Sequence, residues 1–510
     1  MMRNQDSLAG RSTSAGAGHG DIQVPIAGGF TFAQAPWTAG PGLALIQAVG
    51  PDDASADPCW TYDDLAARVA ALAGDLRSQG LAPGQLVAVP ERPAAGLVLM
   101  QHALARVGAA LLPVRLAADD PGVGPLLALT GAEWGWHWDG PVGGRLTRLD
   151  AAHSEGSAPP CAPAPVSGAW VWPSPLALVV ETSGSTGAPR AAMLTQHNLL
   201  AAAALSNRHL ALRAGDCWLC CLALRYIGGL SITYRCALAG ATQLLHEGFD
   251  AELVAADLER RGVTHLSLVP PMLARLLALR RPPPPSLRVL LVGGQSLSTQ
   301  LAGQAIAAGW PLHLTYGMTE TASQVATSGR LSASPAPGQV GRPLAGLEVD
   351  CPGGPDGPAP LRVRGPVVMA GYANPGRRPG LGLADGWFTT SDLGRRGEDG
   401  ALSILGRADE VLVTGGVKVH PGWVESLLAG APGVGAVAVV GVEDSVWGQR
   451  LVAFYTGEAR PAALDAWCRA NLAGPQRPRA FRSRAELPLL NSGKLDRRRL
   501  RVLALGPAAP

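Results

Sequence analysis

Two kinds of apolar spacing alternate along the first third of the chain. Leu65, Val69, Leu72 and Leu76 recur every three or four residues, which predicts a helix that begins after a capping residue at Thr61. Short continuous apolar runs predict buried strands at 86–89, 109–114 and 176–180. This alternation of helix and strand is typical of a parallel sheet with helices on its faces.

The alternation of predicted strands and helices continues in the middle of the chain, and a different pattern follows it. Further strands are predicted at 266–269, 287–292 and 312–314. Glycine and proline dominate 353–386, which indicates a β-rich lobe, and the tail predicts helices at 422–428 and 462–472 with strands at 436–440 and 451–455. We therefore predict an α/β fold with a disordered leader (1–25), a large N-terminal domain of parallel and mixed sheets (26–405) and a small α+β domain (406–510).

Composition narrows the class of protein. The chain has 510 residues and a net charge of +3, which gives no case for nucleic-acid binding. Its eight cysteines form no regular framework, and Cys217, Cys220 and Cys221 lack a zinc spacing, so we expect these three to be buried thiols and the protein to be cytoplasmic. The longest uncharged stretch, 156–180, is interrupted by prolines and serines, which argues against a membrane span. A monomer and a homodimer both remain open.

The segment from Thr182 to Arg190, TSGSTGAPR, has the composition of a phosphate-binding loop. It follows a predicted strand, and a helical run opens at Thr195, so its backbone N–H groups are expected to point at an anion. Gly184 and Gly187 would allow close approach, and Arg190 adds a fixed charge. Hydroxyl donors come from Thr182, Ser183, Ser185 and Thr186. An ordinary surface loop is the alternative, and the segment lacks the Lys-Ser/Thr pair of a Walker loop.

A second chemical motif, YGMTE, runs from Tyr316 through Gly317 to Glu320 and follows the predicted strand 312–314. Open α/β sheets bind ligands at the carboxyl ends of their strands. Glu320 offers a hard oxygen for Mg²⁺ held on substrate phosphates, Thr319 can donate to a phosphate oxygen, and Tyr316 presents a flat face to a purine. The alternative is an ordinary turn with a solvated glutamate.

In their order, these segments resemble the hallmarks of the adenylate-forming superfamily of acyl-CoA and aryl-CoA ligases, luciferases and adenylation domains. Arg190 stands where that family usually has lysine. Further segments match in the same order, and the resemblance implies a role for each of their residues. These are adenine contacts at Gly293, Gly294 and Gln295, ribose contacts at Asp392 and Arg407, a hinge at Asp409, a coenzyme A channel at Gly415 and Gly416, and a mobile lysine at Lys494.

The resemblance implies a two-step reaction that uses ATP, Mg²⁺ and coenzyme A. A carboxylic acid attacks the α-phosphate of ATP, and a thiol then displaces AMP from the acyl-adenylate. Lys494, Glu320, Thr319 and Arg190 are the implied catalytic residues, which would stabilise charge on the phosphates. The small domain is expected to be mobile, turning at its hinge so that Lys494 leaves and the channel glycines arrive.

Within the superfamily, the chain is most similar to the o-succinylbenzoate–CoA ligases of menaquinone and phylloquinone biosynthesis. The similarity is carried by Tyr316–Thr327, which contains Ser323, and by Tyr226-Ile-Gly-Gly229 at the implied acyl pocket, where Tyr226 replaces a usual histidine. Arg235 falls where a subgroup member has an arginine suited to a substrate carboxylate. That substrate has two carboxylates, so one must be held while the other reacts.

Three alternatives stay open at this point. The chain would be another aryl- or acyl-CoA ligase if Arg235 were structural, or an adenylation enzyme that loads a carrier-protein thiol. A nucleotide-binding relic without activity is disfavoured by the intact Glu320, Asp392 and Lys494.

Overall fold

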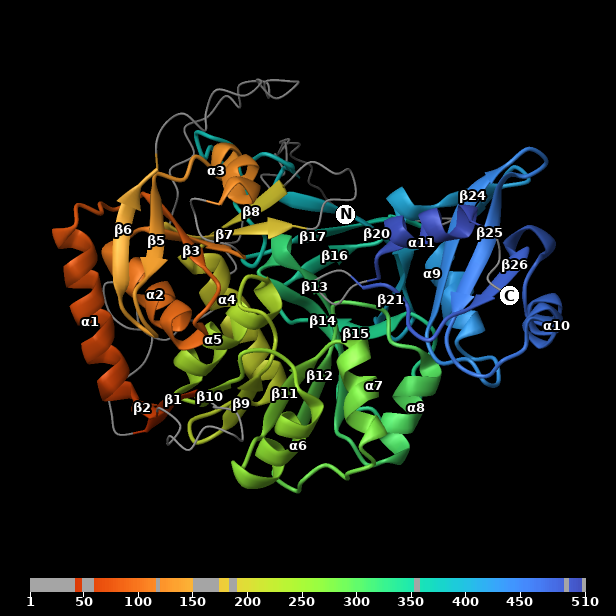
Figure 1. Cartoon of the computed structure of the whole chain (residues 1–510), viewed down its shortest axis with the longest axis horizontal. Coiled ribbons are helices and arrows are strands. Elements are labelled where there is room, and N and C mark those ends of the chain that lie inside the picture. Colours follow the sequence, from red (N-terminus) through yellow and green to blue (C-terminus); the bar gives the residue numbers. More distant parts are fainter. Residues whose placement is uncertain are drawn as a thin grey trace, which may run out of the picture.

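The computed structural model describes residues 42–47, 59–115, 120–149, 174–182, 190–352, 358–489 and 495–506, which form three sheets with covering helices (Figure 1). The predicted α/β class is confirmed. The leader predicted at 1–25 lies outside the described residues. Within the described part of the chain, none of the helices combines the length and apolar character that a membrane crossing requires.

The first sheet has the strand order β18-β8-β7-β4-β3-β5-β6, and its central strands are parallel. Its strands are β3 (Leu86–Pro90), β4 (Ala110–Val114), β5 (Trp134–Trp138), β6 (Gly144–Arg148), β7 (Leu176–Thr182), β8 (Arg190–Thr195) and β18 (Gly371–Tyr372). Its nearby helices are α1 (Tyr62–Ser78), α2 (Ala94–Val107) and α3 (Gly124–Thr130). The predicted capping box forms, because the Thr61 hydroxyl accepts from the Asp64 amide while Asp64 accepts from the Thr61 amide.

The second sheet is parallel in one half and antiparallel in the other. Its parallel half consists of β9 (Cys217–Cys220), β10 (Thr242–Leu245), β11 (His265–Leu268), β12 (Val289–Val292) and β13 (Leu312–Met318), with β1 (Leu43–Gln47) and β2 (Cys59–Thr61) at the edge. The crossover helices are α5 (Ile227–Ala239), α6 (Ala251–Arg260), α7 (Pro270–Ala278) and α8 (Thr299–Ala307). Each predicted strand of this half is confirmed, and β13 continues beyond its predicted end at 314 to Met318.

From β13 onward the second sheet becomes the predicted β-rich lobe. The antiparallel strands are β14 (Ser323–Thr327), β15 (Gln339–Pro343), β16 (Glu348–Asp350), β17 (Ala359–Arg364), β19 (Leu383–Ala384), β20 (Trp387–Arg396) and β21 (Leu402–Arg407). The switch from parallel to antiparallel pairing falls at β13, so both halves of the sheet meet at the YGMTE segment.

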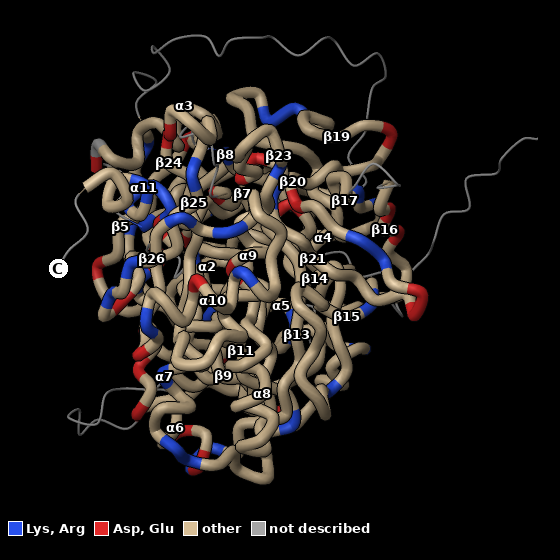
Figure 2. The backbone as a smooth tube through the Cα atoms, turned by 90° about the vertical axis from the view of Figure 1, so that its right-hand side faces the viewer, with Lys and Arg blue, Asp and Glu red and all other residues tan. Residues whose placement is uncertain are grey.

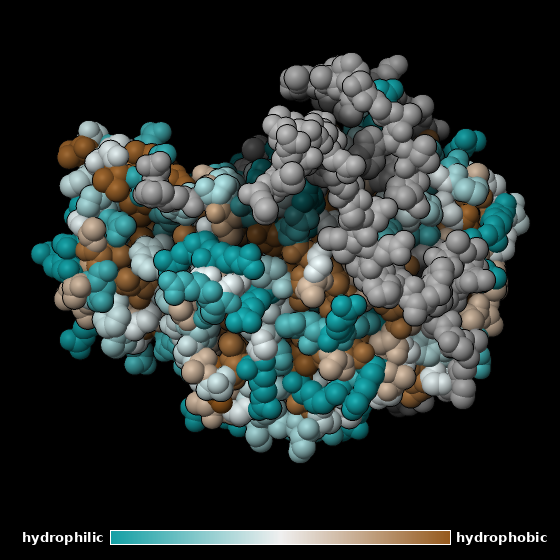
Figure 3. Space-filling view, turned by 180° about the vertical axis from the view of Figure 1, so that it is seen from behind, coloured by the Kyte–Doolittle hydropathy of each residue, from teal (hydrophilic) through white to brown (hydrophobic). Residues whose placement is uncertain are grey.

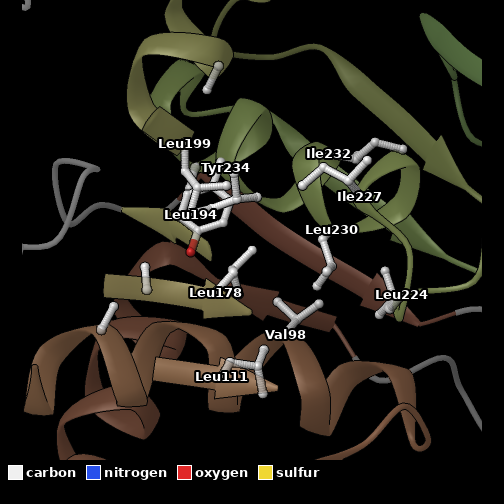
Figure 4. Close-up of a cluster of buried hydrophobic side chains, with 14 of the residues drawn as sticks. Val98, Leu111, Leu178, Leu194, Leu199, Leu224, Ile227, Leu230, Ile232 and Tyr234 are labelled. Atoms are coloured by element: carbon white, nitrogen blue, oxygen red, sulfur yellow. The ribbon is translucent and has the colours of Figure 1, made fainter. Parts of the chain in front are cut away.

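The largest core lies between these two sheets. Helix α4 (Gln196–Leu210) packs on β7 and β8, and α5 packs on β9, β10 and β14. Leu178 and Val180 of β7 face this core while Val179 faces the opposite side, as the two-residue period of a strand requires. Figure 4 shows Leu178, Leu194 and Leu230 converging there. Helices α2 and α5 are apolar nearly all round because neighbouring elements surround them.

The C-terminal unit, residues 412–506, forms a separate sheet at the right of Figure 1. Its elements are β22 (Leu412–Thr414), β23 (Val417–Val419), β24 (Val437–Asp444), β25 (Gly448–Tyr455), β26 (Ala480–Ser483), α9 (Pro421–Leu428), α10 (Pro461–Asn471) and α11 (Arg497–Leu505). The predicted helices and strands of the tail are confirmed within a few residues. Figure 2 shows acidic and basic residues interleaved along the chain, and Figure 3 shows apolar patches among polar ones on this unit.

Candidate active site

The predicted phosphate loop joins two antiparallel strands. Thr182 at the end of β7 pairs with Arg190 at the start of β8. The sequence predicted a helix directly after this loop. Helix α4 does begin after Thr195, but the apolar run 191–194 forms the buried strand β8 between the loop and the helix. Within the loop, Ser183, Gly184, Ser185, Thr186 and Gly187 lie outside the described residues.

Glu320 and Arg190 both lie next to Tyr372, a tyrosine that was not predicted from the sequence. Glu320 lies in the short turn Thr319–Thr321, and its Oε1 accepts a hydrogen bond of 2.9 Å from the Tyr372 hydroxyl. The Arg190 guanidinium lies 5.7 Å from the centre of the Tyr372 ring. Burial and the neighbouring Glu320 raise the pKa of Tyr372, so its hydroxyl stays a donor. The sequence signal was weak, because Tyr372 stands in a Gly/Pro-rich stretch with no motif around it.

The turn around Glu320 is tight. A Cβ on Gly317 would lie 1.6 Å from the carbonyl oxygen of Ser323, so no larger residue fits there. Ala322 and Ser323 have φ values of 52° and 126°, which non-glycine residues rarely adopt. Strain of this kind gathers at functional sites because surrounding contacts must hold it in place.

The predicted ribose residues form one connected group. Tyr316 donates from its hydroxyl to Asp392 Oδ2 at 2.8 Å, and Arg407 Nη1 lies 3.5 Å from Asp392 Oδ1. Arg407 also donates to both carboxylate oxygens of Asp409, at 2.9 and 2.7 Å. Burial, followed by the charge of Asp392, raises the pKa of Tyr316 well above its ordinary value. The Tyr316 side chain is thereby fixed beside the carboxylate that is predicted to hold the ribose.

The predicted adenine loop lies against β13. A Cβ on Gly293 would come within 2.6 Å of Thr315 Cγ2, so glycine is needed for this close approach. Gly294 is exposed and Gln295 is half-buried beside it. The loop therefore follows β12, next to the strand β13 that carries Tyr316.

Arg235 lies inside the protein. Its side chain is on α5 and only 2% of the residue is exposed. Nη2 donates to Ser323 Oγ at 2.8 Å, and the guanidinium lies 5.1 Å from the centre of the Trp218 ring. Burial lowers the pKa of Arg235 to about 10, so the group remains charged at neutral pH. Among the described residues no carboxylate forms an ion pair with it, and its Nε has no hydrogen-bond partner.

Tyr226 precedes α5 at the start of the predicted acyl pocket. Its hydroxyl accepts a 2.8 Å hydrogen bond from Arg225, whose other amino group is paired with Glu91. Gly229 packs against the preceding turn, where a Cβ would lie 2.8 Å from the Ala223 carbonyl oxygen. The helix that begins here also carries Arg235, two turns further along.

The predicted coenzyme A loop is a two-residue hairpin between β22 and β23. Gly415 and Gly416 have φ values of 55° and 76°, which a type I′ turn requires. The Gly415 amide donates to the Trp447 carbonyl at 2.8 Å. A hollow beside this hairpin is lined by Val413, Gly415, Gly416 and residues 443–449. Val446 at its rim is 80% exposed, so this face of the C-terminal unit is open to solvent.

The described residues that flank the predicted mobile lysine belong to the C-terminal unit. Lys494 itself lies outside the described residues, and the residues on either side of 490–494, Leu489 and Leu495, pair in an antiparallel bridge. Just beyond the bridge, Arg497 is paired with Glu425 and Glu410. Because two carboxylates neutralise this arginine, it is not available to a ligand.

Comparison with known proteins identifies the family. The sequence pattern of the AMP-binding enzyme family matches residues 48–373, and that of the AMP-binding enzyme C-terminal domain matches residues 423–494. The chain belongs to the AMP-binding enzyme family. The predicted membership of the adenylate-forming superfamily is thereby confirmed.

The relatives of this chain within the AMP-binding enzymes include ligases named for 2-succinylbenzoate. The chain is 35% identical over 336 residues to a 2-succinylbenzoate–CoA ligase of Bacillus cereus, a match that covers 64% of this chain and 69% of the relative. It is similar to the Bacillus subtilis o-succinylbenzoate CoA synthetase (MenE) in complex with the acyl-adenylate OSB-AMP, with a TM-score of 0.72 and 26% identity over 90% of this chain and 95% of the other. For a single-residue variant of Escherichia coli MenE with bound OSB-AMS, the TM-score is 0.71 and the identity 28%, over 91% and 95% of the two chains.

Proposed function

We propose that this chain is an AMP-forming acid–CoA ligase that converts o-succinylbenzoate to o-succinylbenzoyl-CoA through an acyl-adenylate, a step of menaquinone or phylloquinone biosynthesis. Its relatives named for this activity support the proposal. The observation that carries the choice of acid is Arg235, a buried charge whose ion-pair partner is absent from the described residues. A charge in the protein interior normally requires a counter-ion, and a second carboxylate on the substrate would supply it.

In the first half-reaction, adenylation, the protein must bind ATP and neutralise the negative charge of its phosphates. Asp392, fixed by Tyr316, offers carboxylate oxygens to the ribose hydroxyls. Arg190, Thr319 and the donors of the loop are proposed to face the phosphates, and Lys494 to stabilise the charge that develops as the acid attacks and pyrophosphate leaves. Stabilisation of this kind suits phosphoryl transfer, which depends on positioning and charge.

The residues present fit Mg²⁺. Glu320 is a hard oxygen ligand, and Tyr372 contacts its Oε1. The described residues contain no group of three or more His, Cys, Asp or Glu that would hold a metal by themselves, which suits an ion that is bound mainly through phosphates and water. When bound, Mg²⁺ would neutralise charge on the phosphate oxygens. Glu320 would hold it at the end of β13.

The second half-reaction needs access for a thiol. The thiol sulfur attacks the carbonyl carbon of the adenylate, and AMP leaves with the electron pair of the broken bond. We propose that the domain boundary lies between 405 and 406 and that rotation near Asp409 brings the Gly415–Gly416 hairpin to the site. Two glycines at the turn present no side chains to a narrow pantetheine chain. The free cysteines among the described residues agree with a cytoplasmic location.

A screen of carboxylic acids tests this proposal. Pyrophosphate release is measured for o-succinylbenzoate, benzoate and aliphatic acids, each with and without coenzyme A. The fastest release is expected with o-succinylbenzoate and coenzyme A together, with one thioester formed per pyrophosphate. Faster turnover of a monocarboxylic acid would favour another acyl-CoA ligase, and adenylation without transfer to coenzyme A would favour a carrier-protein thiol.

A further inference from the structure

Tyr372 connects the two large sheets at the proposed phosphate site. It lies in β18, which pairs with β8 of the first sheet through the register Tyr372 with Ala192. Its hydroxyl reaches Glu320, which follows β13 of the second sheet. The backbone amide of Met369 also donates to the Glu320 carbonyl at 2.8 Å. The side chain and the backbone of Glu320 are therefore both held by the segment 369–372.

The Tyr372 ring is itself firmly placed. A Cβ on Gly382 would lie 2.6 Å from Tyr372 Cδ2, so this glycine packs directly on the ring. Phe388 meets the ring edge to face with 6.3 Å between centres, and the Tyr372 amide donates to the Leu381 carbonyl at 2.8 Å. A ring held on several sides gives its hydroxyl a fixed direction.

We infer that the Tyr372 hydroxyl is a positioning group that orients the Glu320 carboxylate toward the metal–nucleotide. The inference rests on the proposed function, in which Glu320 binds Mg²⁺ on the phosphates. A glutamate has three rotatable bonds, and a donor on one oxygen leaves the other oriented for the metal. Partners of this kind commonly fix metal-binding carboxylates, and their loss costs about 10- to 100-fold in metal affinity.

Arg190 lies beside the same tyrosine side chain. Its guanidinium lies over the Tyr372 ring at 5.7 Å, while the hydroxyl of the same ring donates to Glu320. The cation is attracted to the aromatic face and is thereby retained beside the phosphate loop.

Direct binding of the metal–nucleotide tests the inference without any acid present. We would titrate Mn²⁺ into the full-length protein with ATP and follow free Mn²⁺ by electron paramagnetic resonance, and measure metal-free ATP binding by calorimetry in EDTA. Tyr372→Phe, which keeps the ring and removes the hydroxyl, is expected to weaken Mn²⁺ binding about 10-fold and to leave metal-free ATP binding unchanged. Tyr372→Leu, which also removes the ring that packs on Gly382 and Phe388, should weaken Mn²⁺ binding at least as much.

Two controls make the result specific. Tyr455→Phe removes a hydroxyl that donates to the Ala459 carbonyl at 2.8 Å in the C-terminal unit, and should leave Mn²⁺ binding unchanged. In Glu320→Gln, the additional change Tyr372→Phe should have little effect, because the oriented carboxylate is already lost. Wild-type Mn²⁺ affinity in Tyr372→Phe, or an equal loss of metal-free ATP binding, would overturn the inference. Failure of the wild-type protein to bind Mn²⁺ with ATP would instead contradict the proposed function.

Discussion

Arg235 donates to Ser323 across the interior of the protein, with 2.8 Å between Nη2 and Oγ, although 88 residues separate them in sequence. Ser323 has the strained φ of 126° and begins β14 directly after the turn that contains Glu320. The segment 320–323 therefore carries the proposed metal-binding carboxylate at its first residue, and its last residue, Ser323, binds the buried Arg235.

Replacing Arg235 by alanine is expected to reduce activity selectively for a dicarboxylate. Loss of one member of a desolvated charge pair costs about 2–5 kcal/mol, which is roughly 30- to 3000-fold in kcat/KM. Steady-state kinetics of Arg235→Ala should show this loss with o-succinylbenzoate, a much smaller one with a monoacid, and nearly unchanged affinity for ATP.

Arg275→Ala is the matched control for this variant. Arg275 also lies 5.1 Å from an aromatic ring centre, that of Phe249, but it is exposed on α7. Its loss should affect neither acid. Equal activity of Arg235→Ala and the wild-type enzyme on the dicarboxylate would make Arg235 structural and leave the general acyl-CoA ligase as the better account.

Gly317→Ala is expected to disrupt the turn that holds Glu320. The new Cβ would lie 1.6 Å from the Ser323 carbonyl oxygen, so the backbone must move. Overpacking of this kind typically costs about 1–3 kcal/mol, and adenylation should fall with it. Gly329→Ala, where nothing lies within 4 Å of the new Cβ, should retain both stability and activity. Thermal unfolding and pyrophosphate release of the two variants, measured together, decide the matter; a fully active Gly317→Ala enzyme would show that the turn is adaptable.

The hinge proposal predicts opposite effects for two substitutions. Asp409→Pro fixes φ within the proposed hinge, so adenylate should form and the thioester should not. Lys494→Ala should slow adenylation by about 10²–10³-fold and spare thioester formation from supplied acyl-AMP.

Asp409→Asn separates stiffness from charge. It weakens the two hydrogen bonds that Arg407 makes to Asp409 without restricting the backbone. Measured by rapid quench, its two half-reactions should stay closer to wild type than those of Asp409→Pro. If Asp409→Pro transfers the acyl group to coenzyme A at the wild-type rate, the hinge lies elsewhere.

The fold was largely predictable because it is encoded in local patterns. The apolar runs of β4 and the 3.6-residue spacing of α1 depend on neighbours within a few positions, so the sequence shows them directly. The strand β8 was missed because it is a short alanine-rich run before a helix cap, and its strand conformation comes from pairing with β7. Tertiary contacts of this kind override local propensity.

The candidate site was predictable only where residues form motifs. Tyr316, Glu320 and Asp392 were found through the segments around them, whereas Tyr372 becomes visible only when β18 brings it next to Glu320. An arginine in a helix normally lies on the solvent side, and the burial of Arg235 follows from the packing of α5 between α4 and the second sheet.

Buried histidines give a prediction about acid stability. Burial lowers the pKa of His102 and of His265 to about 4, against an ordinary value of 6.5. The unfolded chain therefore binds protons that the folded protein does not, and the stability falls as the pH drops from about 6.5 to 4. Each such histidine lowers the free energy of unfolding by up to about 1.4 kcal/mol for every pH unit that the pH falls within that window.

A variant without one of these rings checks this sign. His102→Leu removes a titrating group from α2, so its free energy of unfolding should depend less on pH between 6.5 and 4 than that of the wild-type protein. Denaturant titrations at several pH values measure the two slopes. Parallel slopes would mean that His102 does not contribute to the pH dependence.

The most direct test of the proposed activity compares o-succinylbenzoate with two analogues that each lack one carboxylate. 4-Oxo-4-phenylbutanoate keeps the chain carboxylate and 2-butanoylbenzoate keeps the ring carboxylate. Mass spectrometry of the thioester formed with ATP and coenzyme A should show rapid conversion of o-succinylbenzoate, slow conversion of one analogue, and none of the other, because one carboxylate reacts while Arg235 holds the second. Equal rates for o-succinylbenzoate and the reacting analogue, or no thioester from o-succinylbenzoate, would contradict the account.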